Sequence, residues 1–131
     1  MRKTTNQFSF MLKPSKYGVG VFATHDIAKN TSLRLFGENK EQKSDSVILK
    51  KSVIPRIFRG YCISRGEKMI APKDFGKMAV GWFINHSKKP NIFHKNLNWF
   101  ALKNIKKREE LLADYNSLGE PKKDKEKYYK K

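Results

Sequence analysis

The chain has 131 residues, which is enough for one compact domain and too short for a multidomain enzyme. Lys and Arg number 29 against 12 Asp and Glu, so the formal net charge is +17, and we expect polyanions or acidic proteins as partners. Because lysine dominates the cations, a lysine-rich proteome is an alternative explanation of this charge.

A single cysteine, Cys62, excludes an internal disulfide and a cysteine-cluster zinc site, and we expect no metal. Residues 1–10 lack the apolar segment of a secretion signal, and no apolar run approaches the length of about 18 residues that a membrane helix needs. We therefore expect a soluble, intracellular protein with no membrane partner, and we do not distinguish cytoplasm from nucleus.

Short strands are predicted along most of the chain. Residues 17–23 place β-branched and aromatic residues among glycines, which indicates a strand or one arm of a hairpin. A polar surface loop is expected over 37–46, and the order of elements within 47–78 stays open. The other predicted strands are 31–36, 47–49, 69–71, 99–102 and 111–115. With few helical periodicities, the predicted fold class is mostly β.

One sequence pattern occurs twice. Phe-Ala, Ile, Lys and Leu at positions 22, 23, 27, 29 and 33 recur at 100, 101, 105, 107 and 111. Both copies predict a strand, a tight turn and a strand, with a chance similarity as the alternative. At the turn, Asn30 tolerates the left-handed conformation, whereas the equivalent Arg108 would adopt it at a greater cost.

Three segments carry side chains suited to binding or catalysis. Gly18 and Gly20 let the backbone approach a ligand, although a plain hairpin with permissive glycines is the alternative. The segment 85–91 predicts either a rigid functional loop or an ordinary polar turn with a surface histidine. Tyr115 ends a predicted strand, where a half-buried core tyrosine is the alternative. The segments are Lys16-Tyr17-Gly18-Val19-Gly20-Val21-Phe22-Ala23, Asn85-His86-Ser87-Lys88-Lys89-Pro90-Asn91 and Glu109-Glu110-Leu111-Leu112-Ala113-Asp114-Tyr115.

In this order and at these separations, the three segments resemble the SET domain family of protein lysine methyltransferases, over residues 13–118. The resemblance implies a fold of small curved β-sheets with a knot-like C-terminal arrangement and short helices. Residues 1–12 would then be an N-terminal extension, and 119–131 a basic C-terminal tail. The resemblance also implies that the chain is an S-adenosylmethionine-dependent protein-lysine N-methyltransferase.

The resemblance implies a role for individual residues. Tyr115 is expected to be catalytic and to orient the transfer to a lysine ε-amine. Phe83 and Ala113 are expected at the substrate channel, and Tyr128 and Tyr129 are candidates to close it, with a disordered tail as the alternative. The small Ala113 leaves the number of added methyl groups open. The residues expected to bind the cofactor are Lys16, Tyr17, Gly18, Val19, Gly20, Asn85, His86 and Tyr115.

Some features depart from the family pattern, and several aromatic and acidic residues are interpreted as structural. Trp82 stands where many members have Arg, and with Cys62 alone the chain resembles the minimal form found in viruses and bacteria. Trp82 and Trp99 are interpreted as core aromatics rather than a nucleic-acid platform. Glu109 and Glu110 are interpreted as turn and surface acids rather than a catalytic pair.

The partner stays open at this point. The substrate would be a protein with a target lysine, histone-like or ribosomal, and the basic surface could tether the enzyme to nucleic acid. A chain of charge +17 should be repelled by a basic tail unless acids gather at the groove, and the acids available for this are Asp45, Glu67, Asp74 and Asp114. The alternative function is a basic nucleic-acid- or ribosome-associated binding module with a non-catalytic scaffold.

Overall fold

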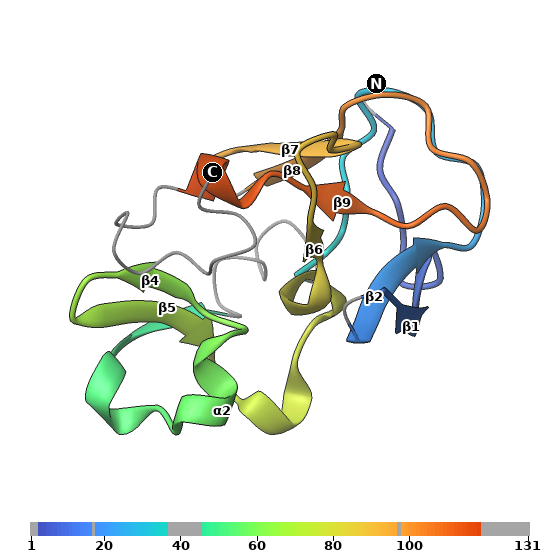
Figure 1. Cartoon of the computed structure of the whole chain (residues 1–131). Coiled ribbons are helices and arrows are strands. Elements are labelled where there is room, and N and C mark those ends of the chain that lie inside the picture. Colours follow the sequence, from blue (N-terminus) through green and yellow to red (C-terminus); the bar gives the residue numbers. More distant parts are fainter. Residues whose placement is uncertain (1–2, 17, 37–45, 97, 119–131) are drawn as a thin grey trace.

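The computed structural model describes residues 3–16, 18–36, 46–96 and 98–118 (Figure 1). Within them the strands form four small sheets. The helices are short: α2 (Arg56–Arg59) and the 3-10 turns η2 (Lys51–Val53), η3 (Phe75–Lys77), η4 (Val80–Phe83) and η5 (Tyr115–Leu118). None of these described helices is long and apolar enough to cross a membrane. The predicted fold class, mostly β with small sheets and short helices, is confirmed.

The strands pair antiparallel, with one exception. Antiparallel pairs join β1 (Phe10–Ser15) to β2 (Gly18–Ala23), and β7 (Ile92–Lys95) to β8 (Asn98–Ala101). A three-stranded sheet has the order β3-β5-β4, where the strands are β3 (Ser46–Lys50), β4 (Ile63–Arg65) and β5 (Lys68–Pro72). The exception is the parallel pair of β6 (Asn85–His86) and β9 (Leu112–Ala113), which returns the C-terminal segment to the loop 85–91.

The two copies of the repeated sequence pattern pack against each other. Ile27 and Ile105 exchange backbone hydrogen bonds of 2.7 and 2.8 Å. The turn residues are equivalent too. Asn30 N of the first copy donates to a carbonyl oxygen of the second copy, and Arg108 N of the second copy donates to a carbonyl oxygen of the first, both at 2.8 Å. Their φ angles are +70° and +75°, so the left-handed turn predicted for Asn30 is confirmed and Arg108 adopts it as well.

Some predicted elements differ from those observed. Residues 31–36 do not form a regular strand: Ser32 makes isolated bridges to Thr4 and Phe100, while Leu33 and Leu35 point into the core. The predicted strand 111–115 is shorter, because the chain turns into η5 at Tyr115. The predicted boundary at residue 13 falls within β1, and most of the predicted loop 37–46 lies outside the described residues.

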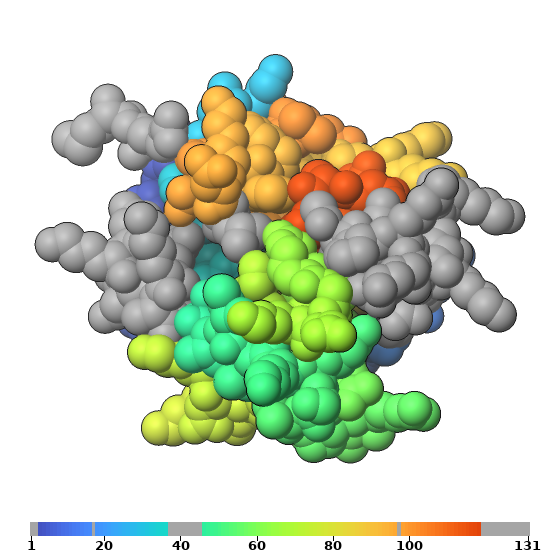
Figure 2. Space-filling model, turned by 90° about the vertical axis from the view of Figure 1, so that its left-hand side faces the viewer, coloured from blue at the N-terminus to red at the C-terminus, as the bar shows by residue number. Residues whose placement is uncertain are grey.

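Two hydrophobic cores stabilise the domain. The larger core gathers side chains from both copies of the repeat, including the fully buried Leu33 and Leu111. A smaller core of Ile54, Cys62, Met69 and Ala71 lies within residues 46–78, which we call the insert. The alternation of side chains along β5 accounts for this smaller core, because Met69 and Ala71 lie on the buried face of the strand. The insert lies at the lower left of Figure 1, and Figure 2 shows it in green below the orange and red segments.

Candidate functional site

A polar cluster forms where the turn between β1 and β2 meets β6. The side-chain amide of Asn85 donates to Val19 O (3.1 Å) and to Glu110 Oε2 (2.9 Å). Ser15 Oγ also donates to the Glu110 carboxylate, at 3.0 Å from each oxygen. These bonds tie three segments that are far apart in the sequence. We call the cluster the cradle, and it consists of Ser15, Gly18, Val19, Gly20, Asn85 and Glu110.

The two glycines of the cradle have different surroundings. Gly18 has a φ of +105°, which favours glycine, and a Cβ added there would meet no atom within 4 Å. A Cβ added at Gly20 would instead lie 2.2 Å from Glu110 Oε2. Gly18 therefore leaves the backbone open to a ligand, whereas Gly20 makes room for the Glu110 carboxylate.

Asn91 fixes the segment that carries Glu110. Its buried side-chain amide donates to Glu110 O (2.7 Å) and Glu109 Oε2 (3.0 Å), and its Oδ1 accepts from Leu112 N (2.8 Å). Ser87 N donates to Ala113 O at 2.9 Å further along the parallel pair. Because the buried amide uses both its donors and its acceptor, the loop 85–91 is held firmly against the segment 109–113.

His86 lies buried next to Tyr115. Its Nδ1 accepts a hydrogen bond of 3.0 Å from the backbone N–H of Tyr115, which places the proton of the neutral ring on Nε2. Burial lowers the pKa of His86, and Lys88 lowers it too, while Asp114 and the backbone at Ala113 act in the opposite direction. Asp114 Oδ1 lies 3.8 Å from Nδ1. His86 is therefore neutral at pH 7 and serves as an acceptor that positions Tyr115.

Tyr115 is half-buried and is held at both ends. Its hydroxyl donates to the carbonyl oxygen of Ile84, directly before the cradle residue Asn85, while its backbone N–H is held by His86. The rings of Tyr115 and His86 are 5.3 Å apart between centroids. The phenol oxygen and the Ile84 carbonyl oxygen therefore form a fixed pair.

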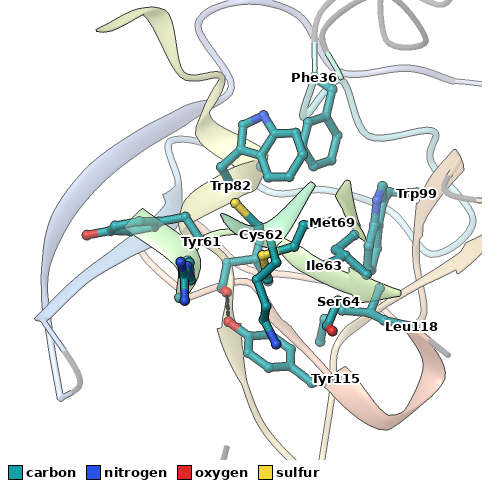
Figure 3. A pocket seen from close by; sticks show the side chains of 16 residues that line it. Phe36, Tyr61, Cys62, Ile63, Ser64, Met69, Trp82, Trp99, Tyr115 and Leu118 are labelled. Carbon is teal, nitrogen blue, oxygen red and sulfur yellow. Dashed lines mark hydrogen bonds between the residues drawn. The ribbon is translucent and has the colours of Figure 1, made fainter. Parts of the chain in front are cut away.

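A cavity of about 250 Å³ opens beside Tyr115, where the insert meets the rest of the domain (Figure 3). Its wall is mainly aromatic and apolar, with Trp82 and Trp99 both more than nine-tenths buried. Figure 3 shows the rings of Trp82, Trp99, Tyr61 and Tyr115 on different sides of the cavity. A side chain that entered here would contact mainly aromatic and apolar groups.

Cys62 also belongs to the cavity wall. Burial raises the pKa of its thiol to about 11, and its Sγ lies 3.6 Å from the carbonyl oxygen of Phe58, to which it donates. Because the thiolate is the nucleophilic form, this cysteine is unreactive at pH 7.

Most of the predicted site residues lie close together. His86 contacts Tyr115, and Ala113 lines the cavity that Tyr115 also lines. Lys16 is exposed at the turn between β1 and β2. Phe83 is not among the described residues of the cavity wall, and its ring packs against Tyr61 at 5.4 Å between centroids. The predicted residues within the cradle are Gly18, Val19, Gly20 and Asn85, and those outside the described residues are Tyr17, Tyr128 and Tyr129.

The sequence profile of the SET domain matches residues 18–116, which include the cradle from Gly18 onward, the loop 85–91 and Tyr115. The chain belongs to the SET domain family. No curated protein is significantly similar to it in sequence.

Solved structures agree with this assignment. A candidate histone methyltransferase of Plasmodium falciparum is 25% identical, with a TM-score of 0.56 over 84% of this chain and 95% of that one. KRYPTONITE, solved in complex with mCHG DNA and SAH, is 24% identical with a TM-score of 0.56. That likeness shows the fold alone, and covers 83% of this chain and 24% of KRYPTONITE. The predicted SET-domain fold is thereby confirmed.

Two residues of this SET domain site were missed by the sequence reasoning. Ser15 carries no signal of its own. Glu110 was not found, because strand alternation places it on the face opposite the buried Leu111 and Ala113, which predicts an exposed acid. Its carboxylate is half-buried in the cradle and is not the surface acid that was expected.

Proposed function

We propose that this SET domain is an S-adenosylmethionine-dependent protein-lysine N-methyltransferase in which Tyr115 orients the transfer. The observation that carries the proposal is the fixed pair of Tyr115 and Ile84 oxygens: both residues line the aromatic cavity, and Ile84 directly precedes the cradle residue Asn85. A cofactor on the cradle side and a lysine on the cavity side would meet at this pair.

The residues of the cradle fit S-adenosylmethionine. The carbonyl oxygen of Val19 and the carboxylate of Glu110 are acceptors of the kind that an α-ammonium group needs. The open side of Gly18 gives a ligand access to the backbone, and the neutral His86 suits an uncharged adenine ring. When bound, S-adenosylmethionine would supply a methyl group activated by its sulfonium.

The chain's own residues would prepare the acceptor lysine. The amine must lose its proton to solvent before it forms the new N–C bond as the C–S bond breaks. Burial among Trp82, Trp99 and Tyr115 lowers a lysine pKa, because a low-dielectric wall disfavours the ammonium. The Tyr115 and Ile84 oxygens are suited to weak C–H···O contacts with a methyl group and to holding the amine in line.

A binding module without turnover is the second candidate, and the net charge of +17 favours it. Such a module would bind nucleic acid with a steep dependence on salt concentration. It would be indifferent to the loss of the Tyr115 hydroxyl. Removal of the Tyr115 hydroxyl oxygen therefore distinguishes the two candidate functions.

The cofactor is tested first, because this step needs no knowledge of the substrate. Thermal unfolding of the full chain is measured with and without S-adenosylmethionine. Ligand at about a hundred times its Kd should raise the free energy of unfolding by about 2.7 kcal/mol, which shifts Tm by several degrees. The shift should disappear in Asn85→Ala. No shift in the parent protein at millimolar cofactor would contradict the proposal.

Transfer is tested second, with cofactor labelled in the methyl group and lysine-containing peptides. Tyr115→Phe should keep the Tm of the parent to within a few degrees and lose at least about tenfold in kcat, because the phenol oxygen acts on the reacting atoms. Full activity in Tyr115→Phe would remove the assigned role of Tyr115.

A further inference from the structure

Tyr115 begins η5, and the far end of this turn is attached to β7. His94 Nε2 lies 3.0 Å from Ser117 O. A carbonyl oxygen can only accept a hydrogen bond, so Nε2 carries the proton and donates to it. At the start of η5, His86 accepts from the backbone N–H of Tyr115. Two histidines from different segments therefore hold this turn, one at its first residue and one near its last.

The turn itself is closed by hydrogen bonds to Asp114. Ser117 N and Ser117 Oγ donate to Asp114 O, at 3.0 and 2.7 Å. The Asp114 carboxylate accepts from the backbone and the side chain of Asn116, at 2.9 and 3.0 Å. Such local bonds fix the conformation of a turn. A bond at Ser117 O therefore also restrains Tyr115, at the other end of the same closed turn.

His94 lies next to a residue of the cavity wall. It is the cross-strand partner of Trp99 on β8, and the two rings are 4.9 Å apart between centroids. Residues that are directly opposite in this way share one face of a sheet. Trp99, Tyr115 and Leu118 all line the cavity (Figure 3). His94 therefore connects the part of the wall that β8 supplies to the part that η5 supplies.

We propose that His94 is a positioning residue for methyl transfer, and that it acts through Tyr115. This inference rests on the proposed function and deepens it. The bond to Ser117 O fixes η5, and with it the place where the Tyr115 hydroxyl meets the Ile84 carbonyl oxygen. A misplacement of about 1 Å can cost about a hundredfold in rate. His94 is not among the described residues of the cavity wall, so its effect on transfer is indirect.

A purely structural role is the alternative, because the loss of a hydrogen bond also lowers the free energy of unfolding. Kinetics separate the two roles. A structural role changes the fraction of folded protein and leaves the kcat of each folded molecule unchanged. A positioning role lowers kcat while the folded protein still binds its cofactor.

The test compares two variants of the full chain. His94→Leu removes the donor, whereas His94→Gln keeps an N–H₂ donor on a side chain of similar reach. Methyl transfer to a lysine-containing peptide is measured at saturating S-adenosylmethionine, and the Kd of the cofactor by calorimetry. We expect kcat to fall about tenfold in His94→Leu and to recover in His94→Gln, with the Kd of both within about twofold of the parent.

Lys95→Leu is the matched control. Lys95 is the next residue of β7, lies exposed and is outside the described cavity wall. This variant should keep the kcat of the parent. The thermal shift with S-adenosylmethionine shows that each variant is folded and binds the cofactor.

A second measurement determines whether His94 acts through Tyr115. His94→Leu is combined with Tyr115→Phe, and the four kcat values form a double-mutant cycle. If His94 places the Tyr115 hydroxyl, its removal should cost little once that hydroxyl is absent. The double variant should therefore be about as active as Tyr115→Phe. A double variant about tenfold below Tyr115→Phe would overturn the inference, because His94 would then act independently of the hydroxyl.

Two further results would overturn the inference. The first is the full kcat of the parent in His94→Leu. The second is a loss in His94→Gln as large as in His94→Leu, because the donated hydrogen bond would then not be the cause. Failure of the proposed function looks different: the parent shows no thermal shift with cofactor and no transfer to any peptide, and the inference falls with it.

Discussion

Ile27 and Ile105 exchange both of their backbone hydrogen bonds, at 2.7 and 2.8 Å, where the two copies of the repeated sequence pattern meet. The same pairing continues outward to Leu111 N, which donates to Val21 O at 2.8 Å. Val21 follows the glycines of the cradle directly, and Leu111 follows Glu110. The contact between the two repeats therefore fixes the hairpin and the Glu110 segment relative to each other, and with them the cradle.

The turn at Arg108 stores strain that a substitution can release. A non-glycine residue in the left-handed conformation costs about 1–2 kcal/mol. Glycine avoids this cost, but folding is less favourable by about 0.5–1 kcal/mol because glycine gives the unfolded chain more conformational entropy. Arg108→Gly should therefore raise the free energy of unfolding by up to about 1 kcal/mol in urea denaturation. Arg108→Ala removes the charge and keeps the strain, so it should not stabilise. Equal stabilisation by both variants would assign the effect to charge.

The repeats also show what the sequence could and could not predict. Strand patterns located β2, β3, β5 and β8 because alternation and β-branched residues act locally. Residues 31–36 were expected to form a strand and do not, because Ser32 is paired only at single bridges to residues distant in the chain. Such pairing depends on the tertiary fold, to which local propensity is blind.

The sequence likewise predicted some residues of the site and not others. Asn85, His86 and Tyr115 were found through short motifs whose spacing is local. Glu110 and the cavity were not, because their partners come from segments that only the parallel pair of β6 and β9 brings together. The cavity wall draws on the insert, where the order of elements could not be predicted.

Glu110 is expected to matter for cofactor affinity. Glu110→Gln places an amide N–H₂ where the carboxylate now accepts from Asn85 and Ser15, and it removes the negative charge of the cradle. Charge-assisted hydrogen bonds contribute about 1.5–3 kcal/mol each, so the Kd for S-adenosylmethionine should rise at least about tenfold by calorimetry. Glu67→Gln, on the exposed turn between β4 and β5, serves as the control and should bind as the parent does. An unchanged Kd in Glu110→Gln would show that its carboxylate is only structural.

Gly20 and Glu110 should be coupled. Gly20→Ala brings a Cβ to 2.2 Å from Glu110 Oε2, so the carboxylate must leave its position. We expect the single variants Gly20→Ala and Glu110→Ala each to weaken cofactor binding, and the double variant to be little worse than either, because both remove the same carboxylate from the cradle. The four Kd values form a double-mutant cycle. Additive losses would mean that Gly20 acts through the backbone alone.

Cys62 should be protected in the native protein. With a thiol pKa of about 11 instead of 9, the thiolate population at pH 8 is about a hundredfold smaller than in the unfolded chain. Alkylation by iodoacetamide, followed by mass spectrometry, should be at least that much slower in buffer than in concentrated urea. The chain has no other cysteine, so each added mass reports this thiol. Similar rates in both conditions would mean that the cavity wall opens readily.

His86 should make the free energy of unfolding depend on pH. Its pKa is lowered in the folded state from the ordinary 6.5, so below about pH 6.5 the unfolded chain binds more protons than the folded one. The stabilisation is therefore present above pH 6.5 and is lost as pH falls through the folded-state pKa. Protonation of Nδ1 would also remove the acceptor for the Tyr115 N–H, and cofactor affinity should fall over the same range.

His86→Asn isolates this group, because the asparagine oxygen can replace Nδ1 as an acceptor without titrating. The free energy of unfolding, measured in urea between pH 5 and 8, should vary less with pH in His86→Asn than in the parent. His25→Asn, which changes an exposed histidine away from the cradle and the cavity, should retain the parent's slope. If the slope survives in His86→Asn and disappears in His25→Asn, the acid sensitivity belongs to His25 and the neutral state of His86 has no part in it.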